Sequence, residues 1–157
     1  MTKPKRLLVV LGNEFRSDDG VGLVVLRDLQ KRCPEGFEYL AHNGDPTDLM
    51  ERWQERQAWL IDALAPQPGD SIGDIKELNP LAGDLLEATP SPSSHAASLA
   101  EALAWGRSLG KLPQSLKVYG VVGGNFAAGT QLSAAVNAAV PKVVEKILQV
   151  TRSQGHA

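Results

Sequence analysis

The chain has 157 residues, with 16 lysines and arginines against 18 aspartates and glutamates, which gives a formal net charge of −2. This length is typical of one compact domain, and we expect residues 1–157 to form it. Basic residues do not cluster among aromatic ones, which argues against nucleic acid as a partner. The apolar run at residues 7–11 is too short for a signal peptide or a membrane span. We therefore expect a cytoplasmic protein that binds neither nucleic acid nor membranes.

Apolar runs alternate with helical patterns along the chain, which predicts βαβ units and a mainly parallel sheet. Continuous apolar residues indicate strands, and apolar residues that recur every three or four positions indicate helices. The predicted strands cover residues 7–11, 37–41, 58–61, 71–78 and 116–122. The predicted helices cover residues 21–33, 47–55, about 96–109 and 133–150. This order predicts a three-layer α/β/α sandwich around a mostly parallel five-stranded sheet.

Local signals refine three of these helices. Met50 and Trp53 are expected to point into the core. Ser98 and Glu101 have the spacing of a capping box, which would place a helix start at Ser98. Pro141 lacks a backbone N–H, so we expect the last helix to be kinked or interrupted there.

Open α/β sheets bind ligands beyond the carboxyl ends of their strands, and the first candidate group follows the predicted strand at 7–11. It runs from Gly12 to Gly22 and contains the adjacent acids Asp18 and Asp19. Both carboxyl groups are expected to be ionised, because the dipole of the following helix favours negative charge. The simpler alternative is that Asp18 only caps that helix. Capping by Asp18 leaves Asp19 unexplained, since a helix cap needs only one side chain.

The other two candidates are single residues. Asp62 follows the apolar residues 58–61 at the end of a predicted strand; the alternative is a solvated loop carboxylate. His95 ends a loop rich in serine and proline, just before a helix whose dipole favours the neutral imidazole that can bind a metal. An ordinary surface histidine is the alternative for His95.

Two carboxylates and one neutral imidazole form a donor set that suits Zn²⁺ or Ni²⁺ and leaves coordination positions open. His42 and His156 are less suitable, because the first lies in a loop of mixed polarity and the second lies near the chain end. The sequence has no serine nucleophile elbow, no His-Glu-x-x-His motif and no P-loop. The glycine-rich residues 123–125 are expected to shape a crevice rather than to bind phosphate.

These motifs resemble the hydrogenase maturation proteases over nearly the whole chain. The matching segments are Leu11-Gly12-Asn13 with Asp18-Asp19-Gly20-Val21-Gly22, Asp62 after an apolar strand, Ser93-Ser94-His95 before a helix, and Tyr119-Gly120-Val121 before the last helix. Three positions depart from the family pattern. Val10 replaces a glycine, Asn43-Gly44-Asp45 replaces Asp-Gly-Gly, and Val122-Gly123-Gly124 lacks an acid often found there.

The resemblance implies an aspartyl-type endopeptidase that removes the C-terminal extension of a nickel-loaded NiFe hydrogenase large-subunit precursor. It implies that Asp19, Asp62 and His95 bind the nickel, with Asp19 and Asp62 as catalytic candidates. Gly12, Asn13 and Asp18 would form the supporting loop. The substrate would carry the nickel, so the protein, expected to be a monomer, would hold no permanent cofactor. Either the substrate nickel acts as a Lewis acid, or Asp19 or Asp62 acts as the base that activates water.

Two rival functions follow from the same residues. A peptidyl-tRNA hydrolase also begins with a strand that ends in Leu-Gly-Asn, but it would need a histidine and a basic surface soon afterwards, and neither is present. A non-catalytic assembly module that recognises the nickel site would keep the same three ligands. Only a measurement of turnover separates this module from a protease.

Overall fold

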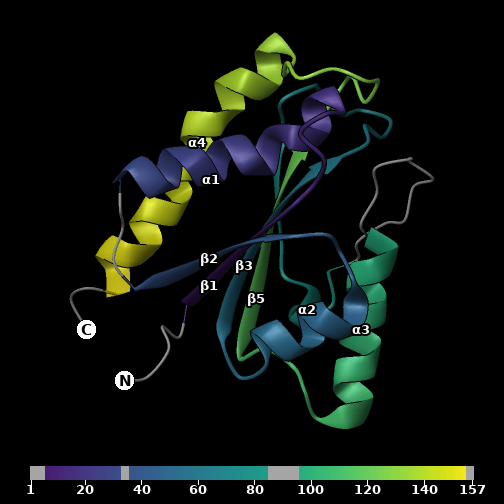
Figure 1. Cartoon of the computed structure of the whole chain (residues 1–157), viewed down its shortest axis with the longest axis vertical. Helices are drawn as coiled ribbons and strands as arrows, with labels where there is room; N and C mark the ends of the chain where they lie inside the picture. The colour runs from purple at the N-terminus through teal and green to yellow at the C-terminus, as the bar shows by residue number, and fades with distance from the viewer. Residues whose placement is uncertain (1–5, 33–35, 85–95, 155–157) are drawn as a thin grey trace.

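The structure of the chain, a computed structural model, describes residues 6–32, 36–84 and 96–154. Within these ranges a five-stranded sheet lies between two layers of helices (Figure 1). The strands are β1 (Arg6–Leu11), β2 (Phe37–His42), β3 (Gln57–Leu64), β4 (Ile75–Leu78) and β5 (Ser115–Val122). The α-helices are α1 (Val21–Arg32), α2 (Pro46–Trp53), α3 (Ala96–Leu109) and α4 (Ala134–Gln154), and the short 3-10 helices are η1 (Ser17–Gly20) and η2 (Pro80–Ala82). The predicted α/β/α sandwich is confirmed.

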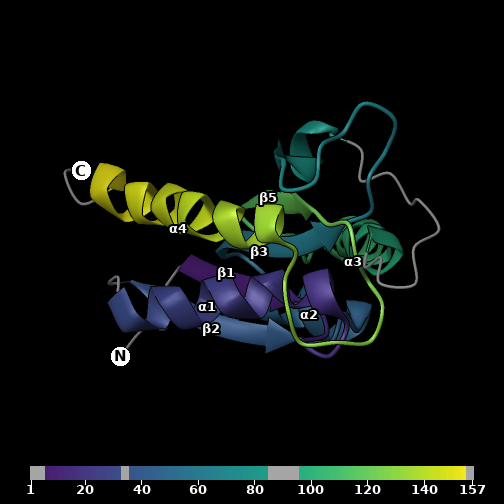
Figure 2. The same cartoon turned by 90° about the horizontal axis from the view of Figure 1, so that it is seen from above.

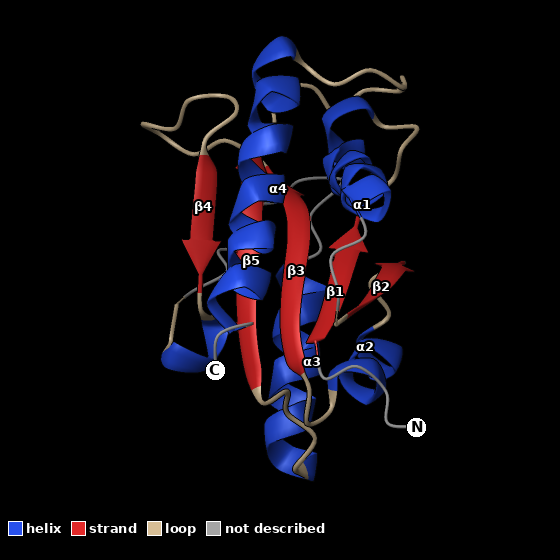
Figure 3. Ribbon diagram, turned by 90° about the vertical axis from the view of Figure 1, so that its left-hand side faces the viewer, coloured by secondary structure: helices blue, strands red, loops and turns tan. Residues whose placement is uncertain are grey.

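The sheet has the order β2-β1-β3-β5-β4, and all neighbouring strands are parallel except β4, which runs antiparallel to β5 (Figure 3). The chain passes from β1 to β2 on one side and then returns past β1 to β3 on the other. In open α/β sheets such a reversal creates a crevice beyond the carboxyl ends of the two strands beside it. Here those strands are β1 and β3.

Both faces of the sheet are apolar. Alternate residues of a strand point to opposite sides of the sheet, and apolar residues occupy both sets of positions. In β1, Leu8 and Val10 pack in the core under α1 and α4, whereas Leu7, Val9 and Leu11 pack in the core that includes α2 and α3. All five side chains are at most 1% exposed. A strand buried on both faces needs a continuous apolar run, which is the pattern that identified β1 in the sequence.

The helices form two separate layers. Helices α1 and α4 lie on one side of the sheet, and α2 and α3 lie on the other (Figure 2). Met50 and Trp53 of α2 are buried, as predicted. None of the helices in the described part of the chain is long and apolar enough to cross a membrane.

The starts of α3 and β4 differ from the predictions. Helix α3 begins at Ala96, so Ser98 lies inside it and the capping-box start is wrong; alanines at its start are strong helix formers. Strand β4 begins at Ile75 rather than at residue 71, because residues 71–74 form a turn. In this turn the Ser71 N–H donates to the Asp74 carboxylate (2.9 Å), and the Asp74 N–H donates to the Ser71 carbonyl (3.1 Å).

Helix α4 continues without interruption through Pro141 to Gln154. The proline removes one backbone hydrogen bond from the helix interior, at a cost of about 3 kcal/mol. Burial of the side chains beyond it offsets this cost, since Val143, Val144 and Ile147 are at most 1% exposed. Of the two predicted outcomes at Pro141, the interruption is therefore wrong, because tertiary packing outweighs the local preference, and the kink stays a prediction.

Candidate active site

The first candidate loop starts where β1 ends. Gly12 has a φ of +133°, and a Cβ atom built on it would stand 2.0 Å from the backbone oxygen of Asp19. Only glycine permits this close approach, which holds Asp19 against the end of β1. The Asn13 N–H donates a hydrogen bond to the Asp19 carboxylate (2.8 Å). Asp19 is therefore a buried carboxylate, 2% exposed, at the carboxyl edge of the sheet.

Asp62 lies in β3, the strand beside β1, and the strand does not end there as predicted. Strand β3 continues to Leu64 because it pairs with β5 that far, whereas its pairing with β1 stops at Ile61. Asp62 is thus the first residue of β3 beyond its pairing with β1. It lies two residues after the buried Leu60, so its side chain faces the same side of the sheet as Leu60, the side covered by α2 and α3. It is 6% exposed, and its Oδ1 accepts a hydrogen bond from the Ala63 N–H (2.9 Å).

The start of α1 connects the two strand ends. A Cβ atom on Gly22 would lie 3.1 Å from the Leu11 carbonyl oxygen and 3.3 Å from the Ile61 carbonyl oxygen. The helix therefore packs closely on the last residue of β1 and on the last residue of β3 that pairs with β1, and its preceding loop brings Asp19 to the same edge as Asp62. Two of the three predicted site residues therefore lie at the carboxyl edge of the sheet between β1 and β3, where the strand order reverses.

Asp18 has a different environment from its neighbour. Its fully buried carboxylate accepts hydrogen bonds from the backbone N–H groups of Gly124 (2.8 Å), Asn125 (2.9 Å) and Ser133 (2.6 Å) and from the Ser133 hydroxyl (2.6 Å). Burial alone would raise the pKa of Asp18, but the hydrogen bonds from Ser133, Gly124 and Asn125 outweigh it and lower the pKa below its ordinary value. Asp18 does not cap α1, so the capping alternative is wrong.

The loop after β5 is held by these contacts. The Asp18 N–H donates to the Asn125 carbonyl (2.9 Å), and the Ser17 N–H donates to the Gly129 carbonyl (2.9 Å). Ser17 has a φ of +53°, a conformation that costs a non-glycine residue about 1 kcal/mol. The glycine-rich loop turns the N–H groups of Gly124 and Asn125 toward Asp18. Its predicted role in shaping a crevice stays a prediction.

His95, the third predicted site residue, lies outside the described residues. Helix α3 begins one position later, at Ala96. Among the described residues, no group of three histidine, cysteine or acidic side chains is placed to hold a metal ion. The donor set therefore stays a prediction for which the structure locates Asp19 and Asp62.

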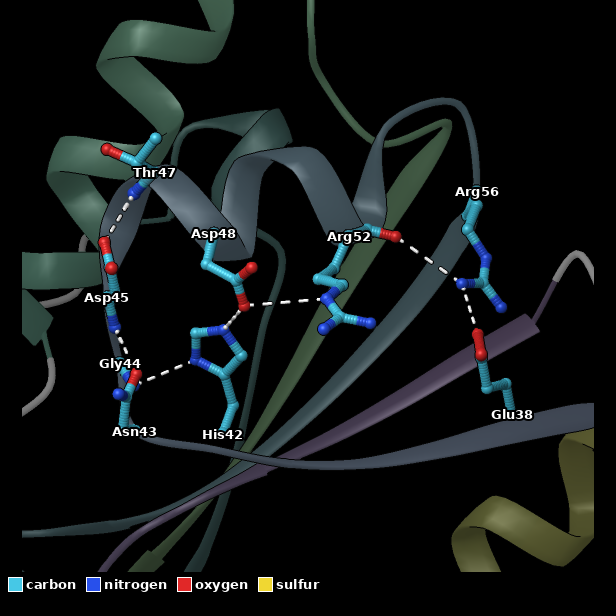
Figure 4. Close-up of polar contacts among 9 residues, drawn as sticks. All are labelled: Glu38, His42, Asn43, Gly44, Asp45, Thr47, Asp48, Arg52 and Arg56. Carbon is cyan, nitrogen blue, oxygen red and sulfur yellow. Dashed lines mark hydrogen bonds and ion pairs between the residues drawn. The ribbon is translucent and has the colours of Figure 1, made fainter.

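His42, which the sequence places in a loop, is the last residue of β2 and pairs with Leu11 in register. Its side chain is 3% exposed. The Gly44 N–H donates to Nδ1 (2.9 Å), so the ring hydrogen is on Nε2, which donates to the Asp48 carboxylate (2.7 Å; Figure 4). The hydrogen bond from His42 lowers the pKa of Asp48, as does the nearby Arg52.

This histidine organises the loop between β2 and α2. Asn43 Oδ1 accepts a hydrogen bond from the Asp45 N–H (2.9 Å), and Asp45 Oδ1 caps α2 by accepting from the Thr47 N–H (3.0 Å; Figure 4). The sequence carried one signal for this arrangement, which is the Asp-Pro-Thr start of α2. Both hydrogen-bond partners of His42 are within six residues of it in sequence, but its position at the end of β2, in register with Leu11, comes from strand pairing and could not be recognised from its loop context.

A cavity of about 450 Å³ lies at the opposite, amino-terminal edge of the sheet, between β4, β5 and α4. Lys117 and Lys146 both approach Glu77 there, at 3.5 and 3.2 Å. Burial, together with the charge of Glu77, raises the pKa of the adjacent Tyr119 to about 12. None of the predicted site residues lines this cavity.

No family model and no curated protein matches the chain, but solved structures do. The hydrogenase maturating endopeptidase HybD from E. coli is 24% identical, with a TM-score of 0.76, over 96% of this chain and 94% of that one. The NiFe hydrogenase maturation protease HybD from Thermococcus kodakarensis is 25% identical, with a TM-score of 0.71, over 93% and 99%. The maturation protease HycI from the same organism is 17% identical, with a TM-score of 0.65, over 94% and 93%. The chain therefore has the fold of these proteases, and the resemblance indicated by its motifs is confirmed.

Proposed function

We propose that this chain is an endopeptidase that removes the C-terminal extension of a nickel-loaded NiFe hydrogenase large-subunit precursor in the cytoplasm. The fold shared with solved maturation proteases supports a peptidase. The observation that supports the proposal is that Asp19 lies beside the end of β1 and Asp62 lies just beyond the pairing of β3 with β1, at the edge where this class of sheet binds ligands. Residues 1–157 act as one domain and one monomer, without a permanent cofactor.

The nickel belongs to the substrate in this proposal. Carboxylate oxygens and a neutral imidazole nitrogen suit a borderline divalent ion, and Asp19, Asp62 and His95 supply these donors. Asp19 and Asp62 are 2% and 6% exposed, so their charges are less screened by water than surface charges would be. A precursor without nickel offers these residues nothing to bind, which makes the completed metal centre the signal for cleavage.

Peptide hydrolysis then needs a base or a Lewis acid. The oxygen of a water molecule attacks the scissile carbonyl carbon, its proton passes to a base and then to the leaving nitrogen, and the C–N bond breaks. Asp19 or Asp62 is the base in one assignment, and in the other the substrate nickel polarises the reacting oxygen. If replacing Asp19 or Asp62 lowers kcat but leaves the binding of the precursor intact, that residue is the base. If the replacement lowers both kcat and binding, that residue is a nickel ligand.

The proposal is tested by mixing the purified protein with a large-subunit precursor, with and without inserted nickel, and following the mass of the precursor. Release of a short C-terminal peptide only from the nickel-loaded form is the expected result. Binding without release would favour the non-catalytic assembly module. Cleavage that does not depend on nickel would remove metal recognition from the site.

Variants make the test specific to these residues. Asp19→Asn, Asp62→Asn and His95→Ala should each stop processing while the protein still folds. Asp28→Asn is the matched control, since it removes a carboxylate whose ion pair with Arg32 (3.5 Å) is on the surface of α1 and contributes little to stability. Normal processing by any of the first three variants would exclude that residue from the site.

A further inference from the structure

Four large apolar side chains are exposed in the described part of the chain: Phe15, Ile72, Trp105 and Leu109. Phe15 has the greatest exposure of the four, at 64%, and lies in the loop that carries Asp19. Single exposed apolar residues are common on protein surfaces and indicate nothing by themselves. Phe15 differs in the way its backbone is held.

The backbone of Phe15 is fixed on both sides. Its N–H donates to the Asn13 side-chain oxygen (2.9 Å), and its carbonyl accepts from the Gly129 N–H (2.9 Å). The next two N–H groups, of Arg16 and Ser17, donate to the carbonyls of Asn13 (3.1 Å) and Gly129 (2.9 Å). The ring therefore extends from a hydrogen-bonded turn, and a partner that buries it has little backbone motion to restrict.

The same contacts connect Phe15 to the candidate site. Asn13 holds Phe15 through its side chain and holds the Asp19 carboxylate through its backbone N–H (2.8 Å). The Asp19 N–H donates in turn to the carbonyl of Arg16 (3.1 Å), the residue after Phe15. The exposed ring and the buried carboxylate therefore belong to one rigid turn. A protein that places a metal ion against Asp19 must bring its surface close to Phe15.

The surroundings of the ring are polar. Glu14, the preceding residue, forms a 2.8 Å ion pair with Arg27, and both side chains are substantially exposed. Asn13 is exposed as well. An aromatic side chain beside a polar rim is the common composition of a protein–protein contact. This composition fits a folded protein partner better than an extended polar peptide.

We propose that Phe15 is the docking anchor that inserts into an apolar depression on the folded part of the precursor, next to its nickel site. This inference rests on the proposed function and names the surface through which it operates. Because the turn links Phe15 rigidly to Asp19, seating the ring orients the nickel toward the carboxylate. Loss of the ring should weaken binding by roughly 10- to 100-fold, the effect expected from burial of one phenylalanine side chain.

The test compares Phe15→Ala, Phe15→Leu and Trp105→Ala with the wild type. Trp105 is the matched control, since it is an exposed aromatic residue on α3, 40% exposed. KM and kcat are measured with the nickel-loaded precursor. Kd is measured with the mature nickel-loaded subunit, which has no tail to cleave and reports binding alone. Melting temperatures confirm that each variant is folded.

Phe15→Ala should raise KM and Kd together and leave kcat unchanged, Phe15→Leu should recover most of the affinity, and Trp105→Ala should match the wild type. Unchanged KM and Kd in Phe15→Ala, or an equal loss in Trp105→Ala, would overturn the docking role. If the wild type binds but does not cleave, the peptidase proposal fails while Kd still decides the role of Phe15. If the wild type does not bind, docking on this partner is overturned.

Discussion

The carboxylate of Asp18 accepts two hydrogen bonds from Ser133, one from its backbone N–H and one from its hydroxyl, each 2.6 Å long. The two residues are 115 positions apart in the chain. Ser133 immediately precedes α4, and its carbonyl accepts the hydrogen bond of the Asn137 N–H (2.9 Å). The contact therefore joins the start of α4 to the loop that carries Asp19.

Replacing Asp18 by asparagine should destabilise the fold. The amide group cannot accept all four hydrogen bonds, and in either orientation its NH₂ would face at least one N–H group that now donates to the carboxylate. The expected loss is about 2–3 kcal/mol in the free energy of unfolding, measured by urea denaturation. Ser133→Ala removes only the hydroxyl and should cost about 1 kcal/mol. Equal stability of Asp18→Asn and wild type would contradict the anchoring role.

The lowered pKa of Asp18 makes the free energy of unfolding depend on pH. Hydrogen bonds hold the pKa of Asp18 below its ordinary value of 3.8 in the folded state, so the unfolded chain binds the proton first as the pH falls. The stabilisation by ionised Asp18 is therefore fully present above the unfolded pKa and is lost as the pH falls through 3.8 toward the lower folded value. The stability difference between wild type and Asp18→Asn should stay constant at neutral pH and shrink in this acidic range. A difference that does not change with pH would show that Asp18 does not ionise differently on folding.

Gly12→Ala should damage the loop more than an ordinary glycine replacement. The added Cβ would collide with the Asp19 backbone at 2.0 Å, in addition to the strain of a φ of +133°. Gly83→Ala is the matched control, because Gly83 also has a positive φ, +102°, but has no atom within 4 Å of an added Cβ. We expect a loss of about 1 kcal/mol for Gly83→Ala and clearly more for Gly12→Ala by thermal denaturation. Similar losses in both variants would mean that the loop moves aside easily.

His42→Leu should expose the role of the buried imidazole. Leucine fills similar space but leaves the Gly44 N–H without its acceptor, at a cost of about 1–3 kcal/mol. Asp48→Asn should cost much less, since the asparagine oxygen still accepts the hydrogen bond from His42 Nε2 and the group is on the surface. Urea denaturation of both variants measures the difference. If Asp48→Asn is the more damaging change, the surface pair rather than the Gly44 contact stabilises the loop.

The sequence by itself determined the layers and most of the strands and helices. The continuous apolar residues of β1 and the helical spacing of α1 depend on local periodicity, and periodicity directly reports which side of an element is buried. The motif around Gly12 and Asp19 was recognisable for a similar reason. A glycine just after a strand, followed by acidic residues just before a helix, is typical of a tight strand-to-helix turn, and such a turn depends only on residues close in sequence. The placement of these residues at the carboxyl edge then follows from the parallel sheet.

Only the tertiary structure decided how the acids differ. Asp18 and Asp19 are adjacent in sequence, yet Asp18 anchors the loop after β5, whereas Asp19 is held at the end of β1. Asp62 lies inside β3 rather than at its end, because β5 extends the pairing beyond β1. His42 is buried because its strand neighbour and the Gly44 loop enclose it. The role of Asp18 depends on a partner 115 positions away, and the places of Asp62 and His42 depend on strand register. Local residue patterns carry no information about either.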